Sequence, residues 1–224
     1  MFTLKRHYKG LETEVAGLQF ENPVGLCGPR AKASYLSGSG LGFLSLTPDY
    51  NNILGWLSAL SSVRKDSTLP AVRLCKDISH SFALVYDFAG FIIIDPDNNE
   101  GIGAPDLADI HMLLDEILDL RLCYEGYTPI LLNIPEGLSR EEMDSCLDYC
   151  QLSGVNGFAT GSLSTLSAVL EKTRSRMGVL YSARSQEDAA QALRQGAALV
   201  ELSGSVLQAR QLLRTLEKQA KKQK

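Results

Sequence analysis

Short apolar runs alternate with longer amphipathic segments from about residue 23 to the end of the chain. The apolar runs are four to six residues long and rich in β-branched residues and leucine, which is typical of parallel strands buried on both faces. Eight such runs predict eight strands. They span residues 23–27, 42–47, 70–75, 91–95, 129–133, 157–160, 178–182 and 198–202.

Helical patterns separate these runs. The clearest lies between Leu107 and Leu122, where apolar residues recur at spacings of three and four and predict one amphipathic helix. Ser139 and Ser185 each precede acidic residues by two or three positions, which is the pattern of a capped helix start. Each cap stands shortly before a helical segment, so both fit the alternation of strand and helix.

Glycine stands at or shortly before the start of five apolar runs. We predict that each of these glycines ends the preceding helix in the left-handed conformation, which glycine adopts without steric cost. The five are Gly42, Gly90, Gly157, Gly178 and Gly196.

The alternation of strands and helices predicts an α/β fold, a compact (β/α)8 TIM barrel closed by right-handed crossovers. Residues 11–22 alternate in hydrophobicity and predict a short N-terminal β-hairpin ahead of the first barrel strand. We expect a single domain over residues 1–224, with the barrel at 23–204 and a C-terminal helix and basic tail at 205–224. An open doubly wound sheet is the alternative, but no GxGxxG turn follows any run.

Composition and charge narrow the classes of function. The chain of 224 residues is 45% hydrophobic and 21% charged, as in soluble globular proteins, and its net charge of −4 argues against nucleic-acid binding. The N-terminus lacks the apolar segment of a signal peptide, and no apolar run approaches the roughly 18 residues of a membrane span. Five cysteines without CxxC spacing and three unclustered histidines predict neither disulfides nor a metal site. We therefore expect a cytoplasmic protein without a metal.

The polar segment that follows the fourth apolar run is the first candidate site. Residues 95–101 read DPDNNEG. Carboxylates and amides at the carboxyl end of a parallel strand are typical of the active-site face of an α/β barrel. The alternative is a solvated turn in which Asp95 or Asp97 braces the turn or caps the helix that begins near Pro105. Cys75, at the end of the third run, either faces the same site or is a buried inert thiol.

Several segments resemble the dihydroorotate dehydrogenase family, and the resemblance extends nearly end to end. The most specific is GLQFENPVGLCGPRAK at residues 17–32, which is similar to the family's Gly-Leu-x-Phe-x-Asn-Pro-Val-Gly-Leu-Ala-Ala-Gly-x-x-Lys. GLGFLSLTP at 40–48 is similar to the family's second strand. GFIIIDPDNNEGI at 90–102 stands where the family has a strand followed by Asn-x-Ser-x-Pro-Asn-x-x-Gly-Leu. Residues 129–162 and 185–202 follow its later strand–helix units.

The resemblance implies an FMN-binding barrel and, if the chain is active, an FMN-dependent oxidoreductase of pyrimidine (UMP) biosynthesis. It implies that Asn98 and Gly101 bind the substrate. The residues that it places around the flavin and its phosphate are Gly28, Lys32, Asn133, Ser182, Ser203 and Gly204.

Other positions depart from the family's pattern. The family's catalytic base falls near Pro96, which cannot accept a proton, so Asp95 or Asp97 would have to serve as the base. The departures nearest the expected flavin are Asn133 for a lysine, Gly161 for an asparagine, and Tyr181-Ser182 for a Gly-Gly pair.

These departures leave two classes of function open. One is a dihydroorotate dehydrogenase-like oxidoreductase; the other is a catalytically degenerate barrel that binds a phosphate-bearing ligand or a protein partner without redox activity. In either class the expected partner is a small-molecule ligand, orotate-like or phosphate-bearing, and not a nucleic acid or a membrane. A homodimer is compatible with both.

Overall fold

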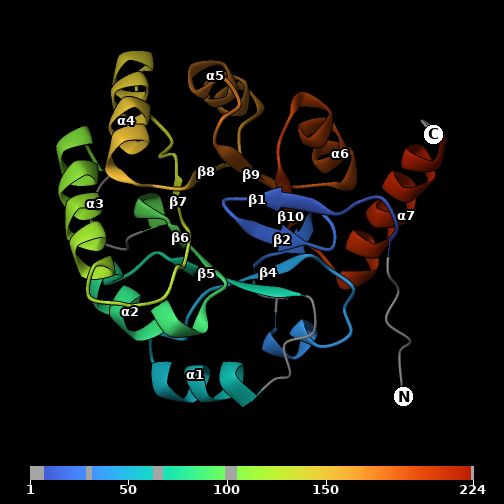
Figure 1. The fold of residues 1–224 in the computed structure, drawn as a ribbon, viewed down its shortest axis with the longest axis horizontal. Coiled ribbons are helices and arrows are strands. Elements are labelled where there is room, and N and C mark those ends of the chain that lie inside the picture. Colours follow the sequence, from blue (N-terminus) through green and yellow to red (C-terminus); the bar gives the residue numbers. More distant parts are fainter. Residues whose placement is uncertain (1–7, 29–31, 63–67, 99–104, 223–224) are drawn as a thin grey trace.

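The computed structural model describes residues 8–28, 32–62, 68–98 and 105–222. Eight parallel strands close into a barrel in the order β10-β3-β4-β5-β6-β7-β8-β9, and helices surround it (Figure 1). Each predicted run forms one strand, so the predicted (β/α)8 barrel is confirmed. The strands are β3 (Val24–Leu26), β4 (Phe43–Leu46), β5 (Leu69–Leu74), β6 (Phe91–Ile94), β7 (Ile130–Asn133), β8 (Gly157–Thr160), β9 (Gly178–Ala183) and β10 (Leu199–Leu202).

The last barrel strand closes the ring by pairing with the first. Val200 of β10 lies opposite Val24 of β3 on one side and opposite Tyr181 of β9 on the other. Because no strand of the ring is left with an unpaired edge, the main-chain hydrogen-bonding groups of the strands are satisfied within the barrel.

Helices cover the outside of the barrel. The predicted helix between Leu107 and Leu122 is α3, and Asp106 caps its start by accepting a hydrogen bond from the Asp109 backbone N–H. Ser139 and Ser185 cap the starts of α4 and α6, as predicted. The helices are α1 (Ile53–Ser62), α2 (Ile78–Val85), α3 (Leu107–Arg121), α4 (Arg140–Ser153), α5 (Leu163–Thr173), α6 (Gln186–Gln195) and α7 (Val206–Lys222).

Three connections contain short 3-10 helices. They are η1 (Ala33–Leu36), η2 (Tyr86–Phe88) and η3 (Pro96–Asn98). Among the described residues between β3 and β4, only η1 is helical, which differs from the expectation of an α-helix after every strand. Gly38 and Gly40 both have positive φ in this connection, at 71° and 72°, and a chain that turns twice in this way cannot continue as an α-helix.

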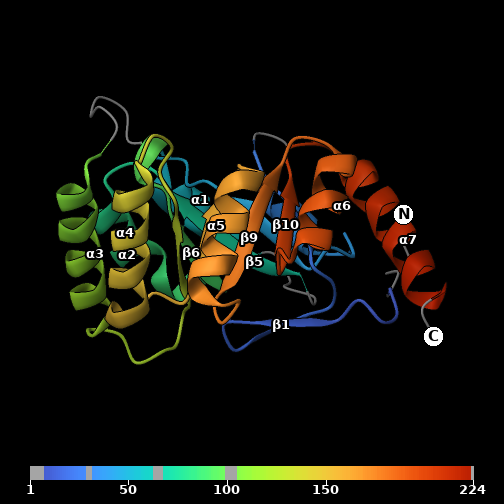
Figure 2. The same cartoon turned by 90° about the horizontal axis from the view of Figure 1, so that it is seen from above.

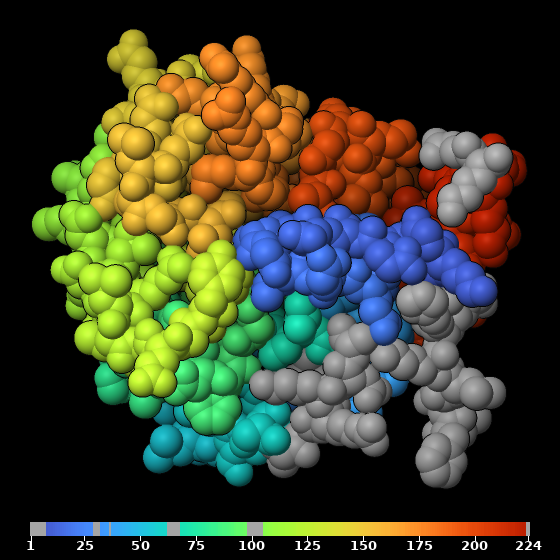
Figure 3. Space-filling model, in the orientation of Figure 1, coloured from blue at the N-terminus to red at the C-terminus, as the bar shows by residue number. Residues whose placement is uncertain are grey.

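The predicted N-terminal hairpin is also present. Its strands β1 (Thr13–Val15) and β2 (Leu18–Phe20) pair antiparallel, and Ala16 and Gly17 between them both have positive φ, as a type I′ turn requires. The hairpin lies across one end of the barrel (Figure 2), and in the space-filling view it covers the middle of that end (Figure 3).

The hairpin seals an apolar core inside the barrel. Phe20 of β2 meets Phe43 and Phe91 edge to face, with ring centroids 6.1 and 5.9 Å apart. Inward residues such as Ile93 and Leu180 complete this interior cluster. A larger apolar core lies between the strands and the surrounding helices. The barrel end opposite the hairpin is therefore the one left for a site.

The prediction for the five glycines is wrong except at Gly196, which ends α6 with φ of 110°. Gly154, and not Gly157, ends α4 in the left-handed conformation. The other glycines serve close packing. A Cβ at Gly178 would lie 2.4 Å from Val15 Cγ1 of the hairpin, and one at Gly42 would lie 1.9 Å from the Asn22 carbonyl oxygen.

No helix within the described ranges is long and apolar enough to cross a membrane.

Candidate functional site

The side chains inside the barrel change from apolar to polar toward the C-terminal ends of the strands. Because alternate residues of a strand point to the same side, Arg73 follows Ala71 into the interior and Glu201 follows Leu199. Hydrogen bonds join the polar side chains of this level into one group, which we call the polar layer. Its members are Arg73, Asp95, Asn133, Ser182 and Glu201.

Arg73 of β5 is the centre of the polar layer. Its Nη1 donates to Asp95 Oδ2 at 2.9 Å, and its Nη2 donates to Glu201 Oε1 at 2.5 Å. The two carboxylate side chains are 2% and 1% exposed, while Arg73 retains 15%. Residues of β5, of the end of β6 and of the distant β10 thus form one buried ion cluster.

Two neutral side chains hold the carboxylates in place. Asn133 Nδ2 at the end of β7 donates to Asp95 Oδ1 at 3.0 Å, so both oxygens of Asp95 accept hydrogen bonds. The Ser182 hydroxyl of β9 donates to Glu201 Oε1 at 2.6 Å. Both Glu201 contacts therefore fall on the same oxygen.

Two buried polar atoms of the barrel interior have no hydrogen-bond partner among the described residues. Among the described residues, neither Glu201 Oε2 nor the Ser45 hydroxyl of β4 has a hydrogen-bond partner. Ser45 alternates with Phe43, whose ring lies in the interior core, so Ser45 also faces inward. Buried polar atoms are normally satisfied, which makes these two positions places where a ligand or water would be stabilised.

The charges of the cluster change the pKa values around it. Burial alone would lower the pKa of Arg73, but the charges of Glu201 and Asp95 outweigh burial and raise it. Burial, followed by the charge of Glu201, raises the pKa of the Cys27 thiol well above its ordinary value. Cys27 is therefore a neutral thiol and not a nucleophile at physiological pH.

Asp95 and Asp97 of the segment 95–101 have different roles. Asp95 is part of the polar layer, whereas Asp97 in η3 is half-buried and accepts a hydrogen bond from the Glu136 backbone N–H at 2.6 Å. Burial raises the pKa of Asp97, against the effect of that hydrogen bond. Asp106 caps α3, so neither Asp95 nor Asp97 has the predicted capping role.

Of the two expected substrate-binding residues, the structure describes only the backbone of Asn98. The backbone of Asn98 ends η3, and Gly101 lies outside the described residues. Cys75, half-buried at the end of β5, lies 3.7 Å from the Tyr50 hydroxyl through its sulfur, and its backbone N–H donates to the same hydroxyl.

The expected flavin-binding residues separate into two groups. Asn133 and Ser182 belong to the polar layer. Gly28 and Ser203 lie close together at the ends of β3 and β10, where a Cβ on Gly28 would be 4.0 Å from Ser203 Cβ, and Gly204 follows. Lys32 is exposed at the start of η1.

Comparison with solved structures identifies the fold. A crystal structure of DHODH (dihydroorotate dehydrogenase) from Eimeria tenella with ferulenol matches with a TM-score of 0.78 and 16% identity, over 95% of this chain and 85% of that chain. The ligand-free DHODH from Eimeria tenella matches with a TM-score of 0.74 and 15% identity, over 96% of this chain and 88% of that chain. This chain is a DHODH-like barrel.

Other comparisons add less. QR15, described as an aldolase, matches with a TM-score of 0.62 and 16% identity, over 86% of this chain and 94% of that chain. No family model and no curated protein matches the sequence. At such identities the likeness establishes the DHODH-like fold, and function has to be argued from the residues themselves.

Two backbone N–H groups in the turns expected to hold an FMN phosphate already donate to side chains of this chain. In barrels of this kind, backbone N–H groups after the last two strands bind phosphate. Here Asp188 Oδ2 accepts from the Arg184 backbone N–H at 2.9 Å, and Gln208 Oε1 accepts from the Ser205 backbone N–H at 2.9 Å. Asp188 also places a negative charge where a phosphate would approach. The Arg184 and Ser205 backbone N–H groups are therefore not available to a flavin phosphate.

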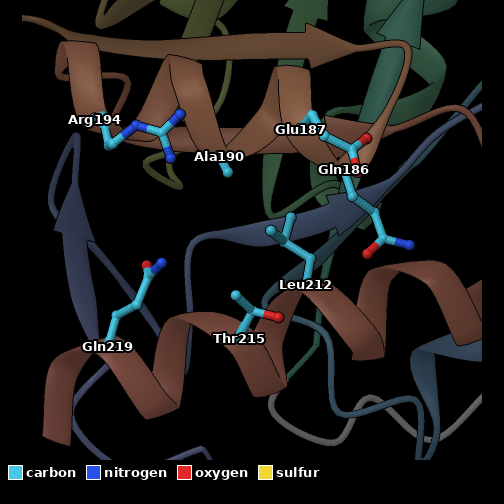
Figure 4. Close-up of a pocket in the computed structure, with 7 residues that line it drawn as sticks. All are labelled: Gln186, Glu187, Ala190, Arg194, Leu212, Thr215 and Gln219. Atoms are coloured by element: carbon cyan, nitrogen blue, oxygen red, sulfur yellow. The ribbon is translucent and has the colours of Figure 1, made fainter. Parts of the chain in front are cut away.

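Two of the hollows outside the polar layer lie at the barrel turns and on the outer wall. One of about 300 Å³ opens between the turns that follow β7 and β8, lined among others by Glu136, Met143 and Thr160. The other lies between α6 and α7 on the outer wall, where Ala190 and Leu212 form its middle and polar side chains its ends (Figure 4). It involves no residue of the polar layer.

Arg73 and Glu201 were missed at the sequence level. Their runs were interpreted only as buried strands. The available signal was a single charged residue within each apolar run. Because side chains alternate along a strand, each charge faces the same side as the apolar residue two positions before it. A charge there must be paired, but the partner depends on which strands meet across the barrel interior.

Proposed function

We propose that this DHODH-like barrel binds a small polar molecule at the polar layer and does so without FMN. The observation that carries the proposal is the Glu201 carboxylate. It is 1% exposed, one of its oxygens pairs with Arg73 and Ser182, and the other has no partner among the described residues. An ionised oxygen left in this state is costly unless a bound molecule or water completes it.

The position of the polar layer supports the same proposal. It lies at the C-terminal ends of the barrel strands, the face at which TIM barrels bind their ligands, while the hairpin covers the opposite end. Arg73, Asn133, Ser182 and Cys27 all keep some exposed surface. A small molecule therefore has a route to the layer from the solvent.

Of the two acidic residues expected to act as a base, Asp97 suits the role better. Both oxygens of Asp95 accept hydrogen bonds, from Arg73 and Asn133, and hold its charge in place. Asp97 is half-buried at the same face and its pKa is raised by burial, which makes it the more ready proton acceptor. Any proton transfer at this site would use Asp97.

The second candidate function is the FMN-dependent oxidation of dihydroorotate by a cytoplasmic flavoprotein of pyrimidine biosynthesis. It is favoured by the two DHODH structures that share the fold and by the retained Lys32 and Asn98. The internal acceptors Asp188 and Gln208 weigh against it, because they satisfy the N–H groups that a flavin phosphate needs.

The visible spectrum separates the two candidates. The protein is purified, incubated with FMN and passed through a desalting column, with a known flavoprotein as the control for retention. We expect a colourless protein without the flavin absorption band. Flavin that co-elutes in a 1:1 ratio would reject the proposal and favour the oxidoreductase.

A further inference from the structure

We propose that copies of this barrel associate head to tail, with the outer face of α7 on one copy docked on the outer face of α3 and α4 on the next. Neither face includes a residue of the polar layer, so this association does not depend on the ligand that the barrel binds. Three features of the molecule lead to it: opposite charges, exposed apolar side chains, and the positions of the two faces around the ring.

Charge is distributed unevenly between these helices. α3 and α4 together carry eight acidic side chains and two arginines. α7 carries five lysines and arginines and one acidic side chain. We call the exposed surface of the first two helices the acidic face, made of Met112, Asp115, Glu116, Asp119, Leu122 and Leu152. The exposed surface of α7 is the basic face, made of Leu207, Arg214, Lys218 and Lys222.

Contacts within the chain leave most of these charges uncompensated. Two carboxylates of α4 pair with cations of the same chain, but the acidic side chains of α3 form no ion pair with another described residue. Asp115 accepts a hydrogen bond from the neutral Tyr149 hydroxyl, which leaves its charge in place. Arg214 and Lys218 likewise form no ion pair with another described residue. Each face can therefore supply the charges that the other lacks.

Exposed apolar side chains lie on the same two faces. Met112, Leu122 and Leu152 of the acidic face are 63, 83 and 89% exposed, and Leu207 of the basic face is 61% exposed. Beside Leu122 the surface is hollowed by about 440 Å³, lined by Asp115, Leu118, Asp119, Arg121, Leu122 and Ser153. A hollow with leucines and carboxylates in its wall fits a helix that presents an apolar side chain together with cations.

The spacing of apolar and charged positions is the same on the two faces. Leu207 and Arg214 of α7 are seven residues apart, and so are Met112 and Asp119 of α3. Because seven residues make nearly two turns, the members of each pair lie on one side of their helix, about 10 Å apart. An apolar contact and an ion pair can therefore form together when the two helices lie side by side.

The two faces lie on opposite sides of the molecule. α3 follows β6 and α7 follows β10, and β6 is four places from β10 in the closed ring of eight strands. Figure 1 shows the two helices on opposite sides of the barrel. A contact between two different faces is heterologous, and faces on opposite sides leave every added copy with one face free. The assembly should therefore grow as a chain and not stop at a dimer.

Sedimentation of the 224-residue protein tests the association. The weight-average mass is measured over a range of protein concentrations in about 0.01 M and about 1 M salt, in which charges are screened over roughly 30 and 3 Å. We expect a mass that rises with concentration beyond that of two chains at low salt and falls to that of one chain at high salt. A monomer at every concentration, a dimer that does not grow, or equal masses at both salt concentrations would overturn the proposal.

Two double variants separate the faces. Arg214→Gln with Lys218→Gln neutralises the basic face, and Glu116→Gln with Asp119→Asn neutralises the acidic face. Each should weaken self-association by about tenfold, because every contact needs both faces. An equimolar mixture should form complexes of two chains and no larger, since one variant keeps the acidic face and the other the basic face. Unchanged self-association of either variant, or a mixture that stays monomeric or grows further, would overturn the proposal.

Arg176→Gln with Arg184→Gln is the matched control. Both arginines are exposed and lie outside the two faces, and their replacement changes the net charge by the same amount as the α7 variant does. This control should associate as the unchanged protein does. An equal loss of association in the control and in the α7 variant would show that net charge governs association, and would overturn the assignment to α7.

Discussion

At the scale of single residues, the buried guanidinium of Arg73 decides how the open end of the barrel is organised. Two carboxylates share it, Asp95 at the end of β6 and Glu201 of β10. A buried ion cluster is expensive to form and still more expensive to break, because removing one partner leaves the others buried and uncompensated.

Replacing Arg73 tests this balance. Arg73→Leu should lower the free energy of unfolding by about 3–5 kcal/mol, measured by urea denaturation, because two carboxylates then repel one another in the interior. The added change Glu201→Gln should restore part of the loss, since one negative charge is removed. Losses that simply add in the double variant would contradict the coupling.

Asp97 gives a pH-dependent prediction. Its pKa is raised in the folded protein, so the folded state binds this proton more tightly than the unfolded chain does. The stability gained is present below the unfolded pKa of about 4 and is lost as the pH rises through the folded value. Asp97→Asn removes the titratable carboxyl group but keeps a side-chain oxygen that can accept the hydrogen bond from the Glu136 backbone N–H.

The measurement for Asp97 is the difference in unfolding free energy between the original protein and the variant across this pH range. We expect the original protein to lose stability relative to Asp97→Asn as the pH rises. A difference that stays flat with pH, or that changes in the opposite direction, would show that burial does not control this carboxyl group.

At the scale of elements, one carboxylate holds the start of α6 in place. Asp188 accepts hydrogen bonds from the Arg184 backbone N–H and from the Tyr181 hydroxyl, each at 2.9 Å. Burial and the bond to Asp188 together raise the pKa of Tyr181 to about 12. One carboxylate thus ties the end of β9 to the helix that follows it.

Loss of this carboxylate should be measurable in two ways. Asp188→Ala should cost about 1–3 kcal/mol in urea denaturation, because it leaves two donors without their acceptor. It should also lower the pKa of Tyr181 from about 12 toward its ordinary value, as followed by ultraviolet titration. Glu187→Ala, an exposed neighbour, is the control and should change stability by less than about 0.5 kcal/mol.

The elements themselves were predictable because their signals are local. Apolar runs identified all eight barrel strands, and the serines before acidic residues identified the starts of α4 and α6. The glycines misled, because the sequence does not distinguish a left-handed helix end from a close contact such as that between Gly178 and Val15. The latter depends on a hairpin more than 150 positions away in the sequence.

The site was less predictable than the fold. The resemblance pointed to the C-terminal face of the barrel and placed Asn133 and Ser182 around a flavin. In the structure these two side chains donate hydrogen bonds to Asp95 and Glu201. The pairing of Arg73 with two carboxylates depends on which strands meet across the barrel interior. That arrangement follows from closure and register, and no local pattern records it.

At the scale of the whole molecule, the two ends of the barrel are lined by different kinds of side chain. The hairpin closes one end with Phe20 against Phe43 and Phe91, and the other end carries the polar layer. Phe20→Ala should lower the free energy of unfolding by about 3–5 kcal/mol, because it opens a cavity in the interior core.

Gln19→Ala, exposed on the same strand, is the matched control for Phe20 and should leave the denaturation midpoint nearly unchanged. The polar layer lies beyond the apolar core, so ligand binding at the polar layer should survive in folded Phe20→Ala protein. Equal effects of the two substitutions on stability would mean that the hairpin does not seal the barrel.

The ion cluster also has a consequence for the making of the protein. Arg73 and Glu201 are 128 positions apart, and β10, which carries Glu201, is the strand that closes the ring. At ordinary rates of translation Arg73 would leave the ribosome roughly 6–26 s before its partner. Throughout that interval the nascent chain lacks β10 and with it the Glu201 carboxylate that pairs with Arg73. Closure of the barrel should therefore follow translation, and a chain truncated before β10 should yield no folded product.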